Sequence, residues 1–255
     1  MVKKSHTITL FILIISLVMG GGLAPAPAQE RVLHIYGPGG PLGPMEECGQ
    51  IFAKEKRIAV KVTAGPTPGW IDQARQDADL IFGGAEYMLT DFILKYPDLV
   101  DPKSRTSLYD RPAGILVRKG NPKKIRFLTD LTRQGIKIID VNGAGQVGLW
   151  EDLAGALGLI PGIQKNIALS VTSSAEAIDK WRAQEELDAW ITFESWHHRL
   201  KDLTDLVQLP KARTLSRGTP IAITTITKQR DLAQQFINFL KTPQAHTVFQ
   251  KWGWR

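Results

Sequence analysis

Short apolar segments with the composition of β-strands alternate along this sequence with longer amphipathic segments, joined by glycine- and proline-rich loops. Such alternation predicts a largely parallel sheet with helices on both faces, because parallel neighbours need a helix-length crossover between them. The predicted strands are residues 32–36, 58–63, 78–82, 136–141, 187–193 and 221–225, and predicted helices include 86–95, 148–157, 229–240 and 244–252. The sequence therefore predicts an α/β fold.

Residues 111–118 predict a strand of a different kind, because they follow an irregular stretch and lead into a tight Gly-Asn-Pro turn instead of a helix. Strand–loop–helix units then resume, until a second irregular stretch at residues 208–220. We expect the chain to cross between two lobes at these two places. The predicted lobes are residues 29–112 with 218–255, and residues 113–217, each a mainly parallel sheet flanked by helices.

The first 28 residues have the organisation of a cleaved signal peptide. Lys3 and Lys4 precede an apolar run at residues 8–19, and Ala26-Pro27-Ala28 is a small-residue cleavage site. An uncleaved membrane anchor is the alternative. We expect export to the periplasm, where Cys48, the single cysteine, has no intrachain partner for a disulfide. Its thiol is expected to pack on a helix, a reactive thiol being the other option.

The formal net charge of +7 falls to +5 when the two leader lysines are removed with the signal peptide. A modest basic excess favours anionic ligands, but the charge is spread along the chain. The absence of a dense Lys/Arg run interleaved with aromatic residues argues against a nucleic-acid partner.

Gly-rich loops follow at least four of the predicted strands. In an open parallel sheet, ligands bind beyond the carboxyl ends of the strands, where helix N-termini attract anions and glycines allow close approach of the backbone. Any one such loop is commonly a plain connection. Four of them in an exported protein predict an anion site between the lobes.

Residues 143–148 spell Gly-x-Gly-x-x-Gly between a predicted strand and helix, which is the dinucleotide-binding pattern. The region about twenty residues further on, Ala168-Leu169-Ser170, lacks the acid that would bind a ribose. We therefore favour a backbone cradle for an anion over a dinucleotide site.

Motifs for catalysis or metal binding do not stand out. The chain has no G-x-S-x-G, H-E-x-x-H or Walker sequence, and His197-His198 point in different directions on a helix. We expect no catalytic residues, no metal ligands and no cofactor.

Arg111 is the most notable charged residue, because it begins the strand that crosses between the lobes. Its planar guanidinium suits a tetrahedral oxyanion or a carboxylate, and a surface or interlobe salt bridge is the alternative. Trp70, Trp150 and Trp196 each follow a candidate loop, where they could wall the cleft or pack in the core beneath it.

Several segments carry a resemblance to the accessory colonization factor C family of periplasmic binding proteins. They are residues 33–41 (LHIYGPGGP), 63–72 (TAGPTPGWID), 78–82 (ADLIF), 86–88 (EYM), 111–113 (RPA), 141–146 with 148–152 (VNGAGQ, GLWED) and 251–254 (KWGW). The resemblance covers residues 29–255 and implies a type 2 periplasmic binding fold similar to molybdate- and sulfate-binding proteins. Such proteins hold a dianion between two lobes with hydroxyl and backbone donors.

The resemblance also implies ligand contacts from the loops: Gly39, Gly40, Thr67, Gly84, Ala85, Asn142, Ala144 and Gln146. To these we add Arg111 and Glu194 from the residues themselves. Glu194 follows a predicted strand at a loop where a neutral side chain is expected. If its carboxylate faced the cleft, it would repel a bare dianion.

These observations predict a monomeric solute-binding protein that captures sulfate, molybdate or a similar oxyanion and delivers it to an inner-membrane permease of the ABC type. A close variant would bind an organic acid and report to a chemoreceptor or a sensor kinase. A third hypothesis, from another class, is an exported enzyme acting on an anionic substrate.

Overall fold

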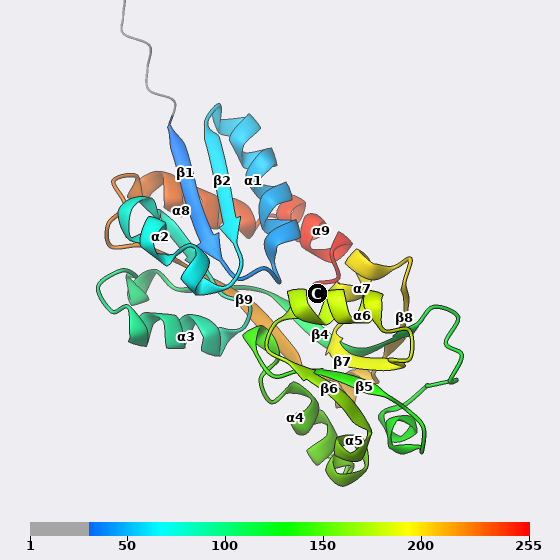
Figure 1. Cartoon of the computed structure of the whole chain (residues 1–255). Coiled ribbons are helices and arrows are strands. Elements are labelled where there is room, and N and C mark those ends of the chain that lie inside the picture. The colour runs from blue at the N-terminus through cyan, green and yellow to red at the C-terminus, as the bar shows by residue number, and fades with distance from the viewer. Residues whose placement is uncertain (1–30) are drawn as a thin grey trace, which may run out of the picture. The chain divides into compact units, whose positions relative to one another are not determined.

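The computed structural model describes residues 31–255 (Figure 1). The predicted signal peptide, residues 1–28, lies outside these residues. Helices flank a long, strongly curled sheet, which confirms the predicted α/β class. Among the described residues, no helix combines the length and the apolar composition needed to cross a bilayer.

Nine strands and nine α-helices make up the described part of the chain. The strands are β1 (Val32–Gly37), β2 (Ala59–Ala64), β3 (Leu80–Phe82), β4 (Thr106–Arg118), β5 (Ile138–Val141), β6 (Ile167–Val171), β7 (Ala189–Phe193), β8 (Thr204–Gln208) and β9 (Ser216–Ile223). The helices are α1 (Leu42–Lys56), α2 (Ile71–Asp77), α3 (Glu86–Lys95), α4 (Leu149–Gly155), α5 (Ile160–Asn166), α6 (Ser174–Ala183), α7 (Ser195–Leu200), α8 (Arg230–Leu240) and α9 (Pro243–Lys251).

The strands follow one another in the order β2-β1-β3-β9-β4-β7-β5-β6, and β8 pairs with β4. The parallel pairs lie at the two ends, where β1 pairs with β2 and β3, and β5 pairs with β6 and β7. The antiparallel strands β4 and β9 join these ends through the middle of the molecule (Figure 1). The sheet thus has two parallel parts, with two crossing strands between them.

The sequence pattern missed β6 and β8, the first five residues of β4 and the first half of β9. The crossing strand β4 begins at Thr106, so the expectation that Arg111 begins it is wrong. Both β6 and β8 are short and largely half-exposed, so they lack the continuous apolar run of a buried strand. The first five residues of β9 read Ser-Arg-Gly-Thr-Pro, which local propensity assigns to a loop. Pairing with β4 makes them a strand, an effect of tertiary contacts that no local pattern contains.

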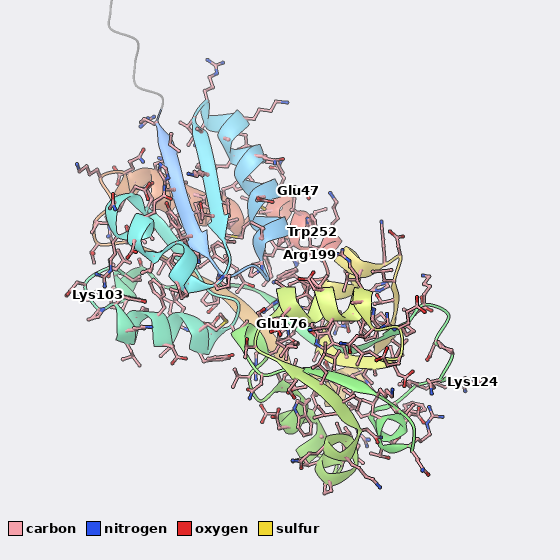
Figure 2. All side chains as sticks on the ribbon, viewed as in Figure 1. Glu47, Lys103, Lys124, Glu176, Arg199 and Trp252 are labelled. Atoms are coloured by element: carbon pink, nitrogen blue, oxygen red, sulfur yellow. The ribbon has the colours of Figure 1, made fainter. Side chains whose placement is uncertain are left out.

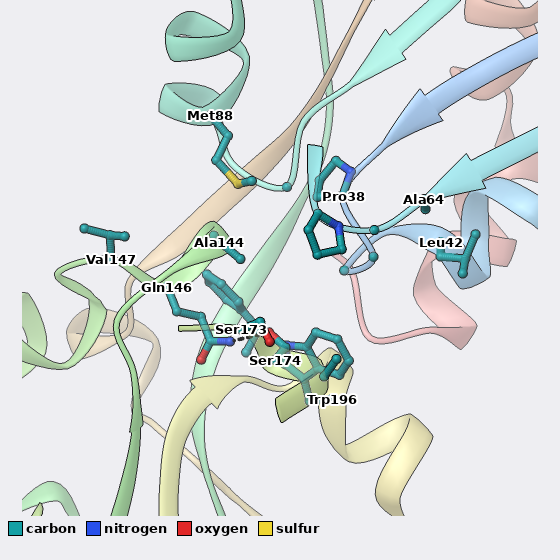
Figure 3. A pocket seen from close by; sticks show the side chains of 18 of the residues that line it. Pro38, Leu42, Ala64, Met88, Ala144, Gln146, Val147, Ser173, Ser174 and Trp196 are labelled. Carbon is teal, nitrogen blue, oxygen red and sulfur yellow. Dashed lines mark hydrogen bonds between the residues drawn. The ribbon is translucent and has the colours of Figure 1, made fainter. Parts of the chain in front are cut away.

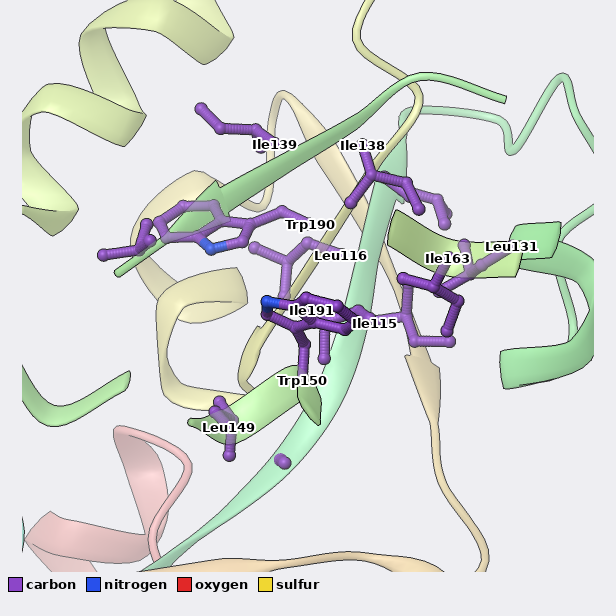
Figure 4. Packing of buried hydrophobic residues seen from close by; sticks show 14 of the residues in the cluster. Ile115, Leu116, Leu131, Ile138, Ile139, Leu149, Trp150, Ile163, Trp190 and Ile191 are labelled. Atoms are coloured by element: carbon purple, nitrogen blue, oxygen red, sulfur yellow. The ribbon is translucent and has the colours of Figure 1, made fainter. Parts of the chain in front are cut away.

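The buried apolar side chains form three clusters. One draws only on residues 113–209 and includes Trp150, Trp181 and Trp190 (Figure 4). The other two combine residues from the first part of the chain, 33–100, with residues from its last part, 221–254. The clusters support our proposal that the lobe boundaries lie at residues 29–112 with 218–255 and at 113–217.

The loop after β5 lies against the neighbouring strand so closely that only glycine fits at its start. A methyl group on Gly143 would lie 1.9 Å from the backbone oxygen of Thr172. Unlike the end of a flexible side chain, this oxygen belongs to a backbone segment just after β6, so it has little freedom to move aside.

We therefore expect Gly143→Ala to lower the free energy of unfolding by about 1–3 kcal/mol, as overpacking in a well-packed region does. Gly69→Ala is the matched control, because a methyl group there would meet no atom within 4 Å. Urea unfolding of both variants checks this. Equal midpoints for the two variants would contradict the expectation.

Candidate anion-binding cleft

A cavity of about 670 Å³ lies between the two parallel parts of the sheet (Figure 3). Its walls come from the loops after β1, β2, β3 and β5, from the first turns of α3 and α6, and from the start of α7. Arg111 of β4 reaches it from the crossing strands. The loops that the sequence singled out therefore converge on one cavity.

Most of the sequence-predicted contacts line this cavity: Gly39, Gly40, Thr67, Gly84, Arg111, Ala144 and Gln146. Three do not line it. Ala85 is fully buried at the start of α3. Asn142 is exposed, and its backbone N–H donates to the backbone oxygen of Val171. The carboxylate of Glu194 points away from the cavity and pairs with Arg255, as described below. As contacts of a ligand, all ten remain predictions.

Arg111 is a buried cation without a carboxylate partner among the described residues. Its side chain is 2% exposed, and one guanidinium nitrogen donates to the backbone oxygen of Gly84. The guanidinium carbon lies 4.2 Å from the ring centroid of Phe193 and 5.4 Å from that of Trp254. Its Nε atom is buried without a hydrogen-bond partner within residues 31–255. The alternative of a surface or interlobe salt bridge is therefore wrong for this part of the chain.

Burial, followed by the neighbouring guanidinium groups of Arg199 and Arg217, lowers the pKa of Arg111 to about 9. Arg217 of β9 is paired directly opposite Arg111 in the antiparallel β4–β9 ladder. Two like charges opposite one another destabilise a sheet. The crossing strands thus place two guanidinium groups side by side, of which Arg111 lines the cavity.

Glycines from two separate loops make room for the guanidinium of Arg111. A methyl group on Gly40 would lie 2.9 Å from its Nη1, and one on Gly145 would lie 3.0 Å from its Nη2. Neither position requires an unusual backbone angle, so close approach to Arg111 is the physical reason for glycine.

Arg199 is a second cavity-lining cation, and the sequence analysis missed it. Its Nη2 donates to the backbone oxygen of Gly40 at 3.3 Å, and its guanidinium carbon lies 5.0 Å from the ring of Trp196. Burial lowers its pKa, which nearby Glu46 partly offsets. Its guanidinium carbon also lies 6.0 Å from the ring centroid of Trp252 (Figure 2). Its spacing of three residues from Trp196 on one helix was the signal that could have indicated it.

The first turn of α6 brings hydroxyl groups to the cavity. The oxygen of Ser173 accepts the N–H of Glu176, and the carboxylate of Glu176 accepts the N–H of Thr172, so these two side chains cap the start of α6. Ser174 accepts a hydrogen bond from the side-chain amide of Gln146 at 2.8 Å (Figure 3). Its own proton stays available to a ligand. The spacing of Ser173 and Glu176 in the sequence is typical of a helix start, but it does not indicate that this start faces the cavity.

The amide of Gln146 is fixed on both sides. Its Nε2 donates to Ser174, and its Oε1 accepts from the indole N–H of Trp190 at 3.2 Å. Gln146 therefore orients the Ser174 hydroxyl. A direct contact of Gln146 with a ligand would be additional to this role.

Glu194 does not face the cavity. It is 5% exposed, its carboxylate oxygens lie 3.1 and 3.3 Å from Nη2 of Arg255, and Gln208 donates to it at 3.2 Å. The sequence predicts that the Glu194 carboxylate would repel a dianion if it faced the cleft. The guanidinium of Arg255 instead neutralises this carboxylate. Asp91 is the single acid among the cavity-lining residues within 31–255, and it is exposed to solvent.

The tryptophans that follow the candidate loops have different surroundings. All three belong to buried apolar clusters, and Trp196 also lines the cavity. Trp70 also donates its indole N–H to the backbone oxygen of Gly65 at 3.1 Å. Only Trp196 is thus placed as a wall of the cleft.

The three glycines of the Gly-x-Gly-x-x-Gly segment each have a local packing or backbone reason. Gly143 abuts Thr172, Gly145 abuts Arg111, and Gly148 adopts φ +69°, a left-handed conformation, just before α4. These roles account for the pattern without a dinucleotide.

Residues 33–255 match the family model described as bacterial extracellular solute-binding protein. The chain belongs to this family. The resemblance to the accessory colonization factor C proteins and the type 2 periplasmic binding fold, both expected from the sequence, are confirmed.

Two solved structures and one curated relative illustrate the likeness of this solute-binding protein. A crystal structure of Campylobacter jejuni PEB3 with bound L-phospholactate has a TM-score of 0.80 and 29% identity, over 88% of this chain and 99% of PEB3. The sulfate-binding protein SubI of Mycobacterium tuberculosis shares the fold, with a TM-score of 0.74 and 20% identity over 88% and 86% of the two chains. A sulfate-binding protein of Synechococcus elongatus is 24% identical over 55% of this chain and 45% of its own length.

The Arg255–Glu194 pair yields a stability prediction. Arg255→Ala should lower the free energy of unfolding by about 1–2 kcal/mol, less than for a fully buried pair because Arg255 is 46% exposed. Adding Glu194→Gln should restore most of the loss, since a neutral amide leaves no unpaired charge.

Urea unfolding of the single and double variants measures this coupling. Arg230→Ala, which opens the exposed Arg230–Asp101 pair, is the control and should have the smaller effect. A double variant no more stable than Arg255→Ala would show that the unpaired carboxylate of Glu194 is not what destabilises Arg255→Ala.

Proposed function

We propose that this chain is a periplasmic binding protein that captures a small oxyanion in the cleft and delivers it to an inner-membrane ABC permease. The observation that carries the proposal is the pair of cavity-lining guanidinium groups, Arg111 and Arg199, neither of which has a carboxylate ion-pair partner within residues 31–255. The hydroxyl groups of Ser173 and Ser174 line the same cavity.

A bound oxyanion would supply the counter-charge that these guanidinium groups lack. Charge-assisted hydrogen bonds from arginine are short and directional, and its planar fork matches two oxygens of a phosphate, sulfate or carboxylate. Removal from water strengthens the attraction, because the effective dielectric constant inside the cleft is low. Donors from the start of α6 would complete the binding site.

The volume of the cavity favours a second candidate, an anion that carries an organic group. About 670 Å³ is within the range of pockets that hold organic ligands, and it exceeds what one tetrahedral ion fills. Apolar side chains of Met88, Ile178 and Trp196 also line it. PEB3 with L-phospholactate supports this candidate, and SubI supports a simple oxyanion. With an organic acid as the ligand, a chemoreceptor or sensor kinase would be an alternative partner.

A thermal-melt panel tests the ligand class. We expect sulfate, molybdate, phosphate or L-phospholactate to stabilise the protein by about 2.7 kcal/mol at a hundredfold excess over the dissociation constant. Citrate and a neutral sugar complete the panel. Stabilisation by the sugar alone would contradict the anion proposal, and turnover of an anionic compound would support the enzyme hypothesis instead.

Arg111→Ala should weaken binding of the stabilising anion about ten- to hundredfold, because a buried charge-assisted hydrogen bond contributes about 1.5–3 kcal/mol. Arg111→Lys should recover part of this loss, since an ammonium group keeps the charge and loses the fork. Calorimetric titration of folded protein measures both. An Arg111→Ala affinity within twofold of the parent would remove Arg111 from the binding site.

A further inference from the structure

One wall of the cavity is held in place by two side chains from other parts of the chain. This wall is the turn of residues 144–147, which contains the short 3₁₀ helix Ala144–Gln146. The hydroxyl of Tyr87 in α3 donates to the backbone oxygen of Ala144. Arg217 of β9 donates to the backbone oxygens of Gly145 and Val147, each at 2.8 Å. Three of the four carbonyl groups of the turn therefore have a donor from outside it.

The two donors also contact each other. The guanidinium carbon of Arg217 lies 5.2 Å from the ring centroid of Tyr87, and its Nη2 lies 3.8 Å from the carboxylate of Asp152 in α4. Burial raises the pKa of Tyr87, so its hydroxyl remains a donor at physiological pH. We call Tyr87, Arg217 and the turn 144–147 the clasp.

The clasp joins opposite walls of the cleft. Tyr87 is on α3, next to Gly84 in the loop after β3, whereas the turn follows β5 at the other parallel part of the sheet. The two walls touch, since a methyl group on Gly145 would lie 3.1 Å from the backbone oxygen of Gly84. Separating the walls therefore requires the Tyr87–Ala144 hydrogen bond to break.

The backbone of the turn shows why it needs such support. Ala144 adopts φ +49°, a left-handed conformation that is uncommon for any residue except glycine. A residue in this conformation persists where the surrounding contacts fix it. The bonds from Tyr87 and Arg217 fix the peptide groups on both sides of Gly145, which itself packs against the guanidinium of Arg111.

We propose that Tyr87 and Arg217 are positioning residues that hold the turn 144–147 against α3, and that the Tyr87–Ala144 hydrogen bond controls how fast a ligand leaves the cleft. The second part rests on the proposed function. Ala144, Gly145 and Gln146 form one wall of the cavity, and Gly84, Tyr87 and Met88 form another. A ligand held between these walls is released when they separate.

Tyr87→Phe removes only the hydroxyl, which makes it the decisive variant. Tyr96→Phe is the matched control, because Tyr96 ends the same helix and its hydroxyl has no hydrogen-bond partner among the described residues. The rate of hydrogen–deuterium exchange at the backbone amides of residues 144–147, measured in ligand-free protein, tests the positioning role. We expect about three- to tenfold faster exchange in Tyr87→Phe and no change in Tyr96→Phe.

Stopped-flow kinetics with L-phospholactate, or with sulfate if only sulfate binds, reads the effect on release. Dissociation should be about three- to tenfold faster in Tyr87→Phe, with association within twofold of the parent. Arg217→Lys keeps the charge but replaces the two nitrogens that bind the oxygens of Gly145 and Val147 with one, so it should change both measurements in the same direction.

Exchange and dissociation rates of Tyr87→Phe equal to those of Tyr96→Phe would overturn the inference. If no anion binds to the parent protein, the proposed function fails, while the exchange measurement still decides whether the clasp holds the turn. Faster exchange with unchanged dissociation would confine Tyr87 to a structural role and overturn the part of the inference on ligand release.

Discussion

The buried guanidinium of Arg111 is the group around which the rest of the cleft is arranged. A desolvated charge without a counter-ion is unfavourable, and the surroundings offset this with the faces of Phe193 and Trp254 and the backbone oxygen of Gly84. The space for it depends on glycine at positions 40 and 145. Because this buried cation has no carboxylate partner among the described residues, we propose an anionic ligand as its counter-ion.

The crossing strands connect this charge to the contacts that hold one wall of the cavity. Arg111 and Arg217 are opposite one another on β4 and β9, the strands that join the two parallel parts of the sheet. Arg111 lines the cavity, and Arg217 holds one of its walls. The cavity-lining charge and the contact with the turn 144–147 thus come from the same pair of strands. A ligand bound to Arg111 would lie close to the bonds that Arg217 makes with this turn.

Trp254 and Arg255 add further contacts between segments that are distant in the sequence. Arg255 pairs with Glu194 and exchanges backbone hydrogen bonds with Asp110, while Trp254 donates to Thr219 at 2.8 Å. The sequence could identify Glu194 as a problem for anion binding, but its neutralising partner is 61 residues away along the chain. Only the fold shows that the two meet.

The sequence by itself determined the α/β class and the loops that reach the cavity, and it indicated Arg111 as a candidate contact, because strand and helix periodicity, glycine placement and residue chemistry are local properties. The tertiary structure alone decided the start of β9, the turn of Glu194 away from the cavity, and the positions of Ser174, Tyr87 and Arg217 at the cavity walls. These depend on which distant segments pack together. A side chain's partner across a cleft is set by the path of the whole chain, and no spacing within one segment contains it.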